Sequence, residues 1–199
     1  MTLALAERDR LRRKMRKRRR ALDDRRANNA SLSIARHLQR IPAFRRARLI
    51  AGYWPVDGEI DVRPALAAVQ KRKVTTVLPV LSRTRTGEMS FAAWRADVPM
   101  TRNRYGIPEP LPTGRRLFRA ANLQVVLVPL LAFDDQGHRI GMGGGYYDRC
   151  FAAATRRPCP WPTMIGVGYE HQRLTEIESA PWDVPLSWVV TENALRRCR

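Results

Sequence analysis

Apolar residues recur along this chain in two different periods, and stretches with each period alternate. Short apolar and β-branched runs predict strands at residues 49–54, 74–80, 89–94, 125–128, 164–169 and 188–190. Between several of these runs the apolar residues recur every three or four positions, which is typical of helices that cover a sheet. This alternation predicts an α/β fold with a largely parallel central sheet between two helical layers, a three-layer α/β/α arrangement.

Three helices are predicted by the spacing of the apolar residues. A basic helix over residues 8–22 carries Leu11 and Met15 on a narrow apolar stripe. A second helix follows and ends at Pro42, and a third covers residues 61–70.

A stretch rich in proline, glycine and arginine interrupts the alternation at residues 99–119. It has little periodicity, which predicts a long ordered loop, and such loops in compact domains are often functional. No repeat or domain boundary is recognisable, so residues 1–199 are predicted to form a single domain, with the basic helix contributing to its ligand site.

The chain is strongly basic, with 37 Lys and Arg residues against 18 Asp and Glu residues and a net charge of +19. Ten of the thirteen residues at positions 8–20 are basic. A field of this sign attracts phosphates, carboxylates and nucleic acids. For residues 8–20 charge alone leaves three interpretations open: a solvated helix face, a contact with nucleic acid, and a contact with the phosphates of a ligand.

Cysteine usage and hydropathy favour a cytoplasmic protein. The three cysteines lack paired CxxC spacing, which argues against a disulfide framework and a zinc site. No apolar run approaches the ~20 residues of a membrane-spanning helix, and the N-terminus lacks the pattern of a secretory signal. We therefore expect no membrane contact.

The strongest chemical signal is RIGMGGGYYDR at residues 139–149, which follows the strand at 125–128 and precedes a predicted helix that runs into residues 150–154. Four glycines in five positions open backbone N–H groups to an anion, and a helix N-terminus adds partial positive charge. Arg139 can donate paired hydrogen bonds to phosphate, and Asp148 can hold Mg²⁺. The segment predicts a nucleotide-phosphate and metal site, with a plain glycine-rich turn as the alternative; its spacing fits neither a P-loop nor a dinucleotide fingerprint.

This string resembles the signature of the 5-formyltetrahydrofolate cyclo-ligase family. The resemblance extends from Arg8 to Glu192 through RLRRKMRKRRRALDD, YWPVDGEID, VLPV, MSFAAW, YGIPEP, VVLVPLLAFDDQGHRIGMGGGYYDR and PWDVPLSWVVTE. It implies a three-layer α/β/α enzyme that converts 5-formyltetrahydrofolate to 5,10-methenyltetrahydrofolate and splits ATP to ADP and phosphate. The implied route phosphorylates the formyl oxygen, and N10 of the substrate then closes the ring.

The resemblance implies that the basic helix and the glycine-rich loop bind ATP. Arg8 and Arg12 match its helical ATP contacts and lie one turn apart, so both can face one polyphosphate. Arg8 stands where the family has a lysine. The loop positions implied are Arg139, Ile140, Gly141, Met142, Gly143, Gly144, Gly145, Tyr146 and Tyr147.

The resemblance also implies a folate site beside the phosphates. Trp54 and Glu59 match folate-contacting positions, and a carboxylate can accept two parallel N–H bonds from the edge of a pterin. Without the resemblance, Trp54 would be interpreted as a core aromatic residue and Glu59 as an acid at a helix start. The loop residues implied to contact folate as well are Met142, Gly143, Gly144, Gly145 and Tyr146.

Asp148 and Asp183 are implied as ligands of Mg²⁺. A lone Asp in a proline-flanked loop is otherwise typical of a turn, so only the resemblance assigns Asp183. Trp182 and Ser187 depart from a histidine and an acid that the family often has, which leaves water to complete the coordination. The implied chemistry needs positioning and charge neutralisation but no protein nucleophile, and no nucleophile motif is found.

Two alternatives remain. A basic nucleic-acid-binding protein on an α/β scaffold is favoured by the charge, but aromatic residues are not interleaved with residues 8–20 and no nucleic-acid motif is recognised. A different enzyme on the same scaffold, such as a sugar-phosphate isomerase or an acyl transferase, is the other. We expect a monomer that binds ATP and 5-formyltetrahydrofolate, with nucleic-acid binding as a secondary property.

Overall fold

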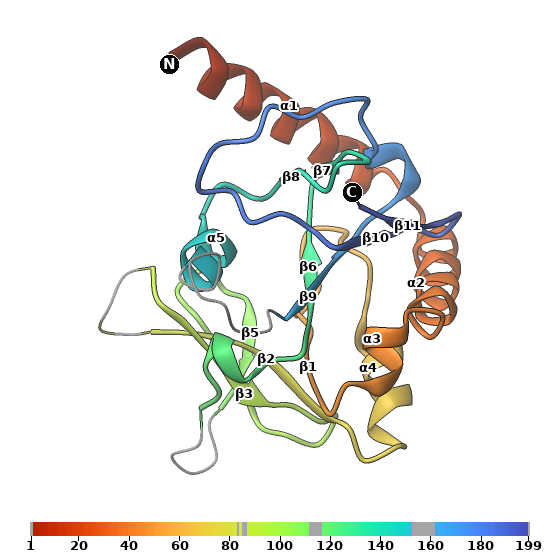
Figure 1. The fold of residues 1–199 in the computed structure, drawn as a ribbon. Coiled ribbons are helices and arrows are strands. Elements are labelled where there is room, and N and C mark those ends of the chain that lie inside the picture. Colours follow the sequence, from red (N-terminus) through yellow and green to blue (C-terminus); the bar gives the residue numbers. More distant parts are fainter. Residues whose placement is uncertain (1, 83, 85–86, 112–116, 153–161, 199) are drawn as a thin grey trace.

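A largely parallel seven-stranded sheet forms the centre of the protein (Figure 1). The structure, a computed structural model, describes residues 2–82, 84, 87–111, 117–152 and 162–198. The strands of the sheet are β1 (Leu49–Ala51), β2 (Thr75–Leu81), β3 (Met89–Ala93), β6 (Val125–Pro129), β9 (Thr163–Val167), β10 (Trp188–Val190) and β11 (Leu195–Arg197). Their spatial order is β11-β10-β9-β6-β1-β2-β3, and only the edge strands β3 and β11 are antiparallel to their neighbours. The parallel sheet predicted from the sequence is confirmed.

Helices pack against both faces of this sheet. They are α1 (Thr2–Arg20), α2 (Asp24–Leu38), α3 (Pro42–Arg46), α4 (Arg63–Gln70) and α5 (Tyr146–Phe151), with short 3₁₀ helices η1 (Ala120–Asn122) and η3 (Glu170–Gln172). The helices α2, α3 and α4 bury one face, where Leu66 and Phe44 join the apolar cluster. Phe151 of α5 belongs to the cluster on the opposite face. The predicted three-layer arrangement is thus confirmed.

Strand β6 shows how one buried strand serves both cores. Val125 and Leu127 lie in the cluster beneath α2 and α4, whereas Val126 and Val128 lie in the cluster beneath α5. Successive side chains of a strand point to opposite faces, so an uninterrupted apolar run is what a strand covered on both sides requires.

Two crossovers leave the middle of the sheet in opposite directions. The chain passes from β1 through α4 to β2 on one side, and from β6 through α5 to β9 on the other. The connections that leave the adjacent strands β1 and β6 therefore diverge at the carboxyl ends of these strands, which is where ligands bind in open α/β sheets. Helix α1 runs across this end of the sheet in Figure 1, and a small hairpin of β7 (Ala132–Phe133) and β8 (Arg139–Ile140) lies beneath it.

The predicted loop at residues 99–119 is partly wrong, because it contains a hairpin of β4 (Met100–Arg102) and β5 (Pro108–Pro110). The second strand was not predicted because it contains Pro108 and Pro110. Proline cannot donate a backbone hydrogen bond to a neighbouring strand and occurs mainly at sheet edges. Residues 112–116 lie outside the described part of the chain.

Four smaller differences remain. Pro42, expected only to end a helix, also begins α3, since proline suits the first turn of a helix. Strand β11 was not predicted, and the strand expected at residues 49–54 ends at Ala51. The helix expected to run into residues 150–154 is described only as far as Phe151, and residues 153–154 lie outside the described ranges. Among the helices of the described residues, none is both long and apolar enough to cross a bilayer.

Candidate active site

Arg19 and Glu59 form a buried pair between α1 and the loop that follows β1. Their side chains are 1% and 5% exposed, and Nη1 of Arg19 lies 3.5 Å from Oε1 of Glu59. The backbone N–H of Val56 donates to Oε2 at 3.1 Å. Burial raises the pKa of Glu59 to about 7, although Arg19 and the Val56 N–H oppose the shift. The carboxyl group therefore changes charge near neutral pH.

Arginines of α1 converge on Asp57 in the same loop. Nε of Arg19 donates to the carbonyl oxygen of Asp57 at 2.8 Å, and Nε of Arg16 lies 3.2 Å from Oδ2. Arg20 pairs with Oδ1. Asp57 holds a left-handed backbone with φ of 54°, which Asp tolerates better than most residues. This cluster fixes the loop that carries Glu59 to the helix.

Sequence reasoning missed Arg19 because it stands in a nearly uniform basic run. A signal was present in the spacing: Arg8, Arg12, Met15 and Arg19 recur at intervals of four, three and four residues, so they share one helix face. Met15 is 2% exposed, which shows that this face points inward. A cation on the buried face of a helix needs a partner, and here the partners are Asp57 and Glu59.

The glycine-rich loop lies beneath an earlier turn of α1. Nε of Arg12 donates to the carbonyl oxygen of Gly141 at 3.1 Å. Gly143 has a φ of 100°, and Gly145, which precedes α5, has a φ of 60°, a region that glycine enters without strain. A Cβ on Gly143 would lie 3.7 Å from Cζ of Arg12. The structure thus brings together Arg12 and the glycine-rich loop. Both were predicted to contact ATP.

Met142 of the glycine loop contacts the arginines of α1 that hold the Glu59 loop. Its sulfur lies 3.9 Å from Nη2 of both Arg16 and Arg19, although its side chain is 40% exposed. Met142, one of five residues predicted to contact both ligands, therefore links the glycine loop to Arg19 of the buried Arg19–Glu59 pair. Trp54 lies in the loop that carries Glu59, half-buried, with the guanidinium of Arg63 4.6 Å from its ring centre.

The β4–β5 hairpin brings further polar groups to the glycine loop. The hydroxyl groups of Tyr105 and Tyr146 are 3.0 Å apart, and Nη2 of Arg104 donates to the Tyr146 oxygen at 2.8 Å. Partial burial acts to raise the pKa of Tyr146, but the bonds from Tyr105 and Arg104 prevail and lower it. Arg104 was not predicted as a site residue, because its position depends on the unpredicted hairpin.

Tyr147, the last residue of the predicted ATP loop, points toward the core instead. Its ring stacks on Phe151 with centroids 6.3 Å apart. Burial, with Glu59 nearby, raises the pKa of its hydroxyl group well above the usual range. Tyr147 is only partly buried, whereas Gly143 and Gly144 are exposed.

Arg139 is held by the protein rather than turned outward. It is 8% exposed, and its guanidinium donates to the Val184 carbonyl oxygen and to Oδ1 of Asp148. The backbone N–H of Val184 donates to the same Asp148 oxygen at 3.2 Å. Arg139 thus orients Asp148 and ties the glycine loop to the segment that contains Asp183.

Arg8, a predicted ATP contact, pairs with Asp183, a predicted metal ligand. Nη2 of Arg8 lies 3.2 Å from Oδ2 of Asp183, which also accepts the Ala180 N–H at 2.9 Å. The other carboxylate oxygens, Oδ1 of Asp183 and Oδ2 of Asp148, accept no hydrogen bond within the described residues. Two free carboxylate oxygens on segments joined by Arg139 suit Mg²⁺, which can take its remaining ligands from a phosphate and water. The described residues contain no group of three or more His, Cys, Asp or Glu side chains that could hold a metal ion.

The sequence profile described as the 5-formyltetrahydrofolate cyclo-ligase family matches residues 4–192. The chain belongs to the 5-formyltetrahydrofolate cyclo-ligase family. Two relatives named 5-formyltetrahydrofolate cyclo-ligase, from Haemophilus influenzae and Escherichia coli K12, are 31% and 32% identical to this cyclo-ligase family member. These matches cover 90% of this chain and 95% and 97% of the relatives.

Solved structures of the cyclo-ligase family share the fold. The NMR structure of Aquifex aeolicus 5,10-methenyltetrahydrofolate synthetase is similar with a TM-score of 0.80 and 28% identity, over 96% of this chain and 93% of the other. The Mycoplasma pneumoniae synthetase has a TM-score of 0.72 at 21% identity, which supports the fold alone. The family resemblance noted from the sequence motifs is confirmed.

Proposed function

We propose that this chain is an enzyme that converts 5-formyltetrahydrofolate to 5,10-methenyltetrahydrofolate at the expense of ATP, with Mg²⁺ as cofactor. One observation of the structure carries the proposal: a single helix, α1, contacts both the Glu59 loop through Arg19 and the glycine loop through Arg12. A reaction that transfers a phosphoryl group from ATP to a folate needs two ligand sites side by side, and this contact supports such an arrangement.

On the folate side, Glu59 supplies an acceptor for the N–H groups of the pterin edge. These donors bind the ionised carboxyl group, so binding of the pterin lowers the pKa of Glu59 from about 7. Arg19 stabilises the same ionised form. The exposed part of Trp54 offers an apolar surface to the ring system.

On the nucleotide side, cations and backbone N–H groups surround the place of the phosphates. Arg12 reaches the loop at Gly141, and the exposed glycines 143 and 144 let phosphate oxygens approach the backbone. Asp148 and Asp183 would hold Mg²⁺, which when bound neutralises charge on the phosphate oxygens. Arg139 and Arg8 keep these two carboxylates in place.

The chemistry follows from this arrangement and needs no protein nucleophile. The formyl oxygen attacks the γ-phosphorus of ATP, an O–P bond forms, and ADP leaves. N10 then attacks the activated formyl carbon, loses its proton, and the C–O bond to phosphate breaks. The chain's contribution is to hold the formyl oxygen in line with the γ-phosphate and to neutralise the developing charge.

The test is the absorbance of the methenyl-folate product with purified protein, 5-formyltetrahydrofolate and Mg²⁺, with and without ATP. We expect a signal that requires ATP and is largely lost in Asp148→Asn, which removes the charge but keeps an acceptor for Val184 N. The matched control is Asp97→Asn, because Asp97 is 75% exposed and pairs only with Arg95 among the described residues. A folded protein that forms no product would overturn the proposal.

A further inference from the structure

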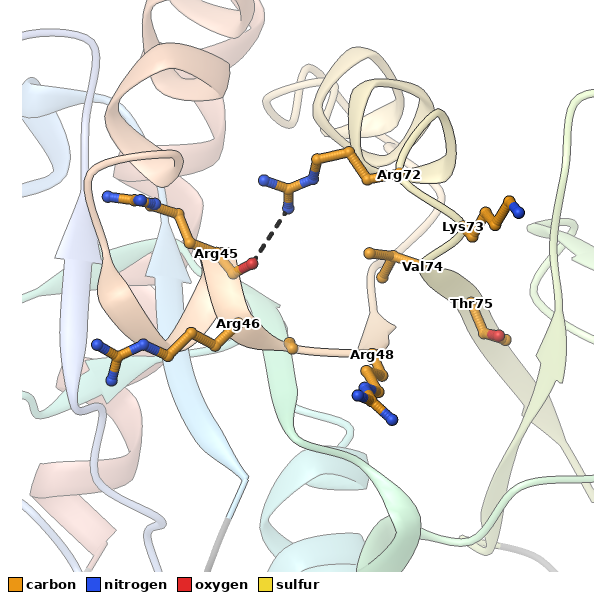
Figure 2. Close-up of a pocket in the computed structure, with 8 residues that line it drawn as sticks. Arg45, Arg46, Arg48, Arg72, Lys73, Val74 and Thr75 are labelled. Carbon is orange, nitrogen blue, oxygen red and sulfur yellow. Dashed lines mark hydrogen bonds between the residues drawn. The ribbon is translucent and has the colours of Figure 1, made fainter.

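A basic hollow lies at the amino-terminal end of the parallel strands, opposite the candidate active site (Figure 2). It has a volume of about 590 Å³. Its walls are the end of α3, the segment that leads into β1, and the turn between α4 and β2. The lining residues are Arg45, Arg46, Ala47, Arg48, Arg72, Lys73, Val74 and Thr75.

Five of the eight lining residues are cationic, and no acid lines the hollow. All five cations are exposed, and within the described residues none forms an ion pair with a carboxylate. Five arginines of α1 differ in this respect: Arg8, Arg12, Arg16, Arg19 and Arg20 each pair with an Asp or a Glu. The charge of the hollow is therefore available to an external anion.

The backbone beneath these cations is fixed. Oε1 of Gln124 accepts the N–H groups of Arg48 at 2.6 Å and Leu49 at 3.2 Å, and the Thr75 N–H donates to the carbonyl oxygen of Arg48 at 2.9 Å. A bond of 3.4 Å from Nη2 of Arg72 to the Arg45 carbonyl oxygen, dashed in Figure 2, joins the two walls. The cations thus project from a rigid platform.

The directions of the side chains indicate an extended ligand. In Figure 2, Arg45 and Arg46 project to one side of the hollow, Lys73 projects to the other, and Arg48 projects downward. Cations that spread outward fit charges repeated along a chain better than one compact anion. Four of the five are arginines, whose planar guanidinium matches phosphate with paired hydrogen bonds.

We propose that this basic hollow binds the phosphate backbone of a nucleic-acid duplex without sequence preference. The lining has no aromatic residue on which an unpaired base could stack, so contacts to the backbone are the ones it can make. ATP and folate do not account for these cations, because their proposed sites lie at the other end of the sheet. The hollow therefore uses part of the +19 charge that the enzyme reaction leaves unexplained.

The test compares two variants with equal net charge in titrations of a labelled short DNA duplex at several salt concentrations. The first replaces Arg45, Arg46, Arg48, Arg72 and Lys73 by Gln. The matched control replaces five exposed α1 cations, Arg10, Arg13, Lys14, Lys17 and Arg18, by Gln. We expect the first variant to weaken binding at least tenfold at low salt and to make the log–log salt slope shallower by about 4, since each phosphate contact contributes about 0.9. The control should keep most of the affinity.

Equal losses in both variants would show attraction by diffuse charge and would overturn the site, as would unchanged binding in the first variant. Binding to anionic phospholipid vesicles through the same five residues, with no duplex binding, would also overturn it in favour of a membrane surface. Duplexes rich in A·T and in G·C should bind equally. If the variant with five substitutions in the hollow fails to fold, the double variant Arg46→Gln/Arg48→Gln is tested in its place. Neither of these two side chains makes a hydrogen bond within the described residues. Duplex binding is measured independently of turnover, so this proposal and the proposed function fail separately.

Discussion

Nη1 of Arg19 lies 3.5 Å from Oε1 of Glu59, in a contact from which solvent is nearly excluded. That nitrogen has no hydrogen-bond partner within the described residues. Burial raises the pKa of Glu59 to about 7, so the guanidinium faces a carboxyl group that is only partly ionised at neutral pH. A ligand that donates N–H groups to Glu59 would complete the ionisation and strengthen the pair.

Glu59 should make the stability of the protein depend on pH. The pKa of Glu59 is 4.5 in the unfolded chain and about 7 in the fold, so the folded protein binds the proton more tightly. This contribution to the free energy of unfolding is fully present below pH 4.5 and is lost as pH rises through 7. Gln cannot ionise, so Glu59→Gln should not lose this contribution. The free energy of unfolding of the variant minus that of the parent chain should therefore increase by about 3 kcal/mol as pH rises from 4.5 to 8. Urea titrations of both proteins across this range measure it, and a constant difference would contradict the shifted pKa.

Arg19→Met should weaken folate binding more than ATP binding. It removes the cation opposite Glu59, so the pKa of Glu59 rises further and less of it is ionised. We expect the KM for 5-formyltetrahydrofolate to rise about tenfold, with a smaller change for ATP, and a loss of about 3 kcal/mol in stability from the broken buried pair. Arg18→Met, on the exposed side of α1, is the control. Equal increases in both KM values would assign Arg19 a purely structural role.

Gly143→Ala tests the glycine loop. The φ of 100° strains any other residue, and the new Cβ would lie beside Arg12, where the phosphates are proposed to bind. We expect the KM for ATP to rise about tenfold, with a cost of about 1 kcal/mol in stability. Gly106→Ala imposes similar strain at a φ of 74° with no atom within 4 Å of the new Cβ, so it should cost stability without raising this KM. Similar ATP kinetics in the two variants would contradict the loop assignment.

Asp183→Asn tests the proposed Mg²⁺ site. The amide can still accept the Ala180 N–H, but the charge that faces Arg8 and the metal is lost. We expect the Mg²⁺ concentration for half-maximal turnover to rise several-fold, with little change at saturating Mg²⁺. An unchanged Mg²⁺ dependence would remove Asp183 from the site.

The sequence predicted the parallel sheet because short, uninterrupted apolar runs such as Val125–Val128 are typical of strands that are buried on both faces. It predicted the glycine loop because backbone conformation at positions such as Gly143 limits which residue can stand there. Arg19 was not singled out, because the ten basic residues of α1 are distinguished only by their position relative to the apolar face that Met15 marks. The basic hollow also escaped prediction, since residues 45–48 and 72–75 become neighbours only through the parallel pairing of β1 with β2.

Helix α1 touches both proposed ligand sites, so we expect binding at one site to affect binding at the other. A ligand that draws the glycine loop toward Arg12 also shifts the helix that carries Arg19, and hence the surroundings of Glu59. If ATP changes the affinity for folate by some factor, folate changes the affinity for ATP by the same factor, because both effects have the same coupling free energy. We therefore expect ordered or synergistic binding to originate in this one helix, and to disappear when its arginine contacts with Asp57 are removed.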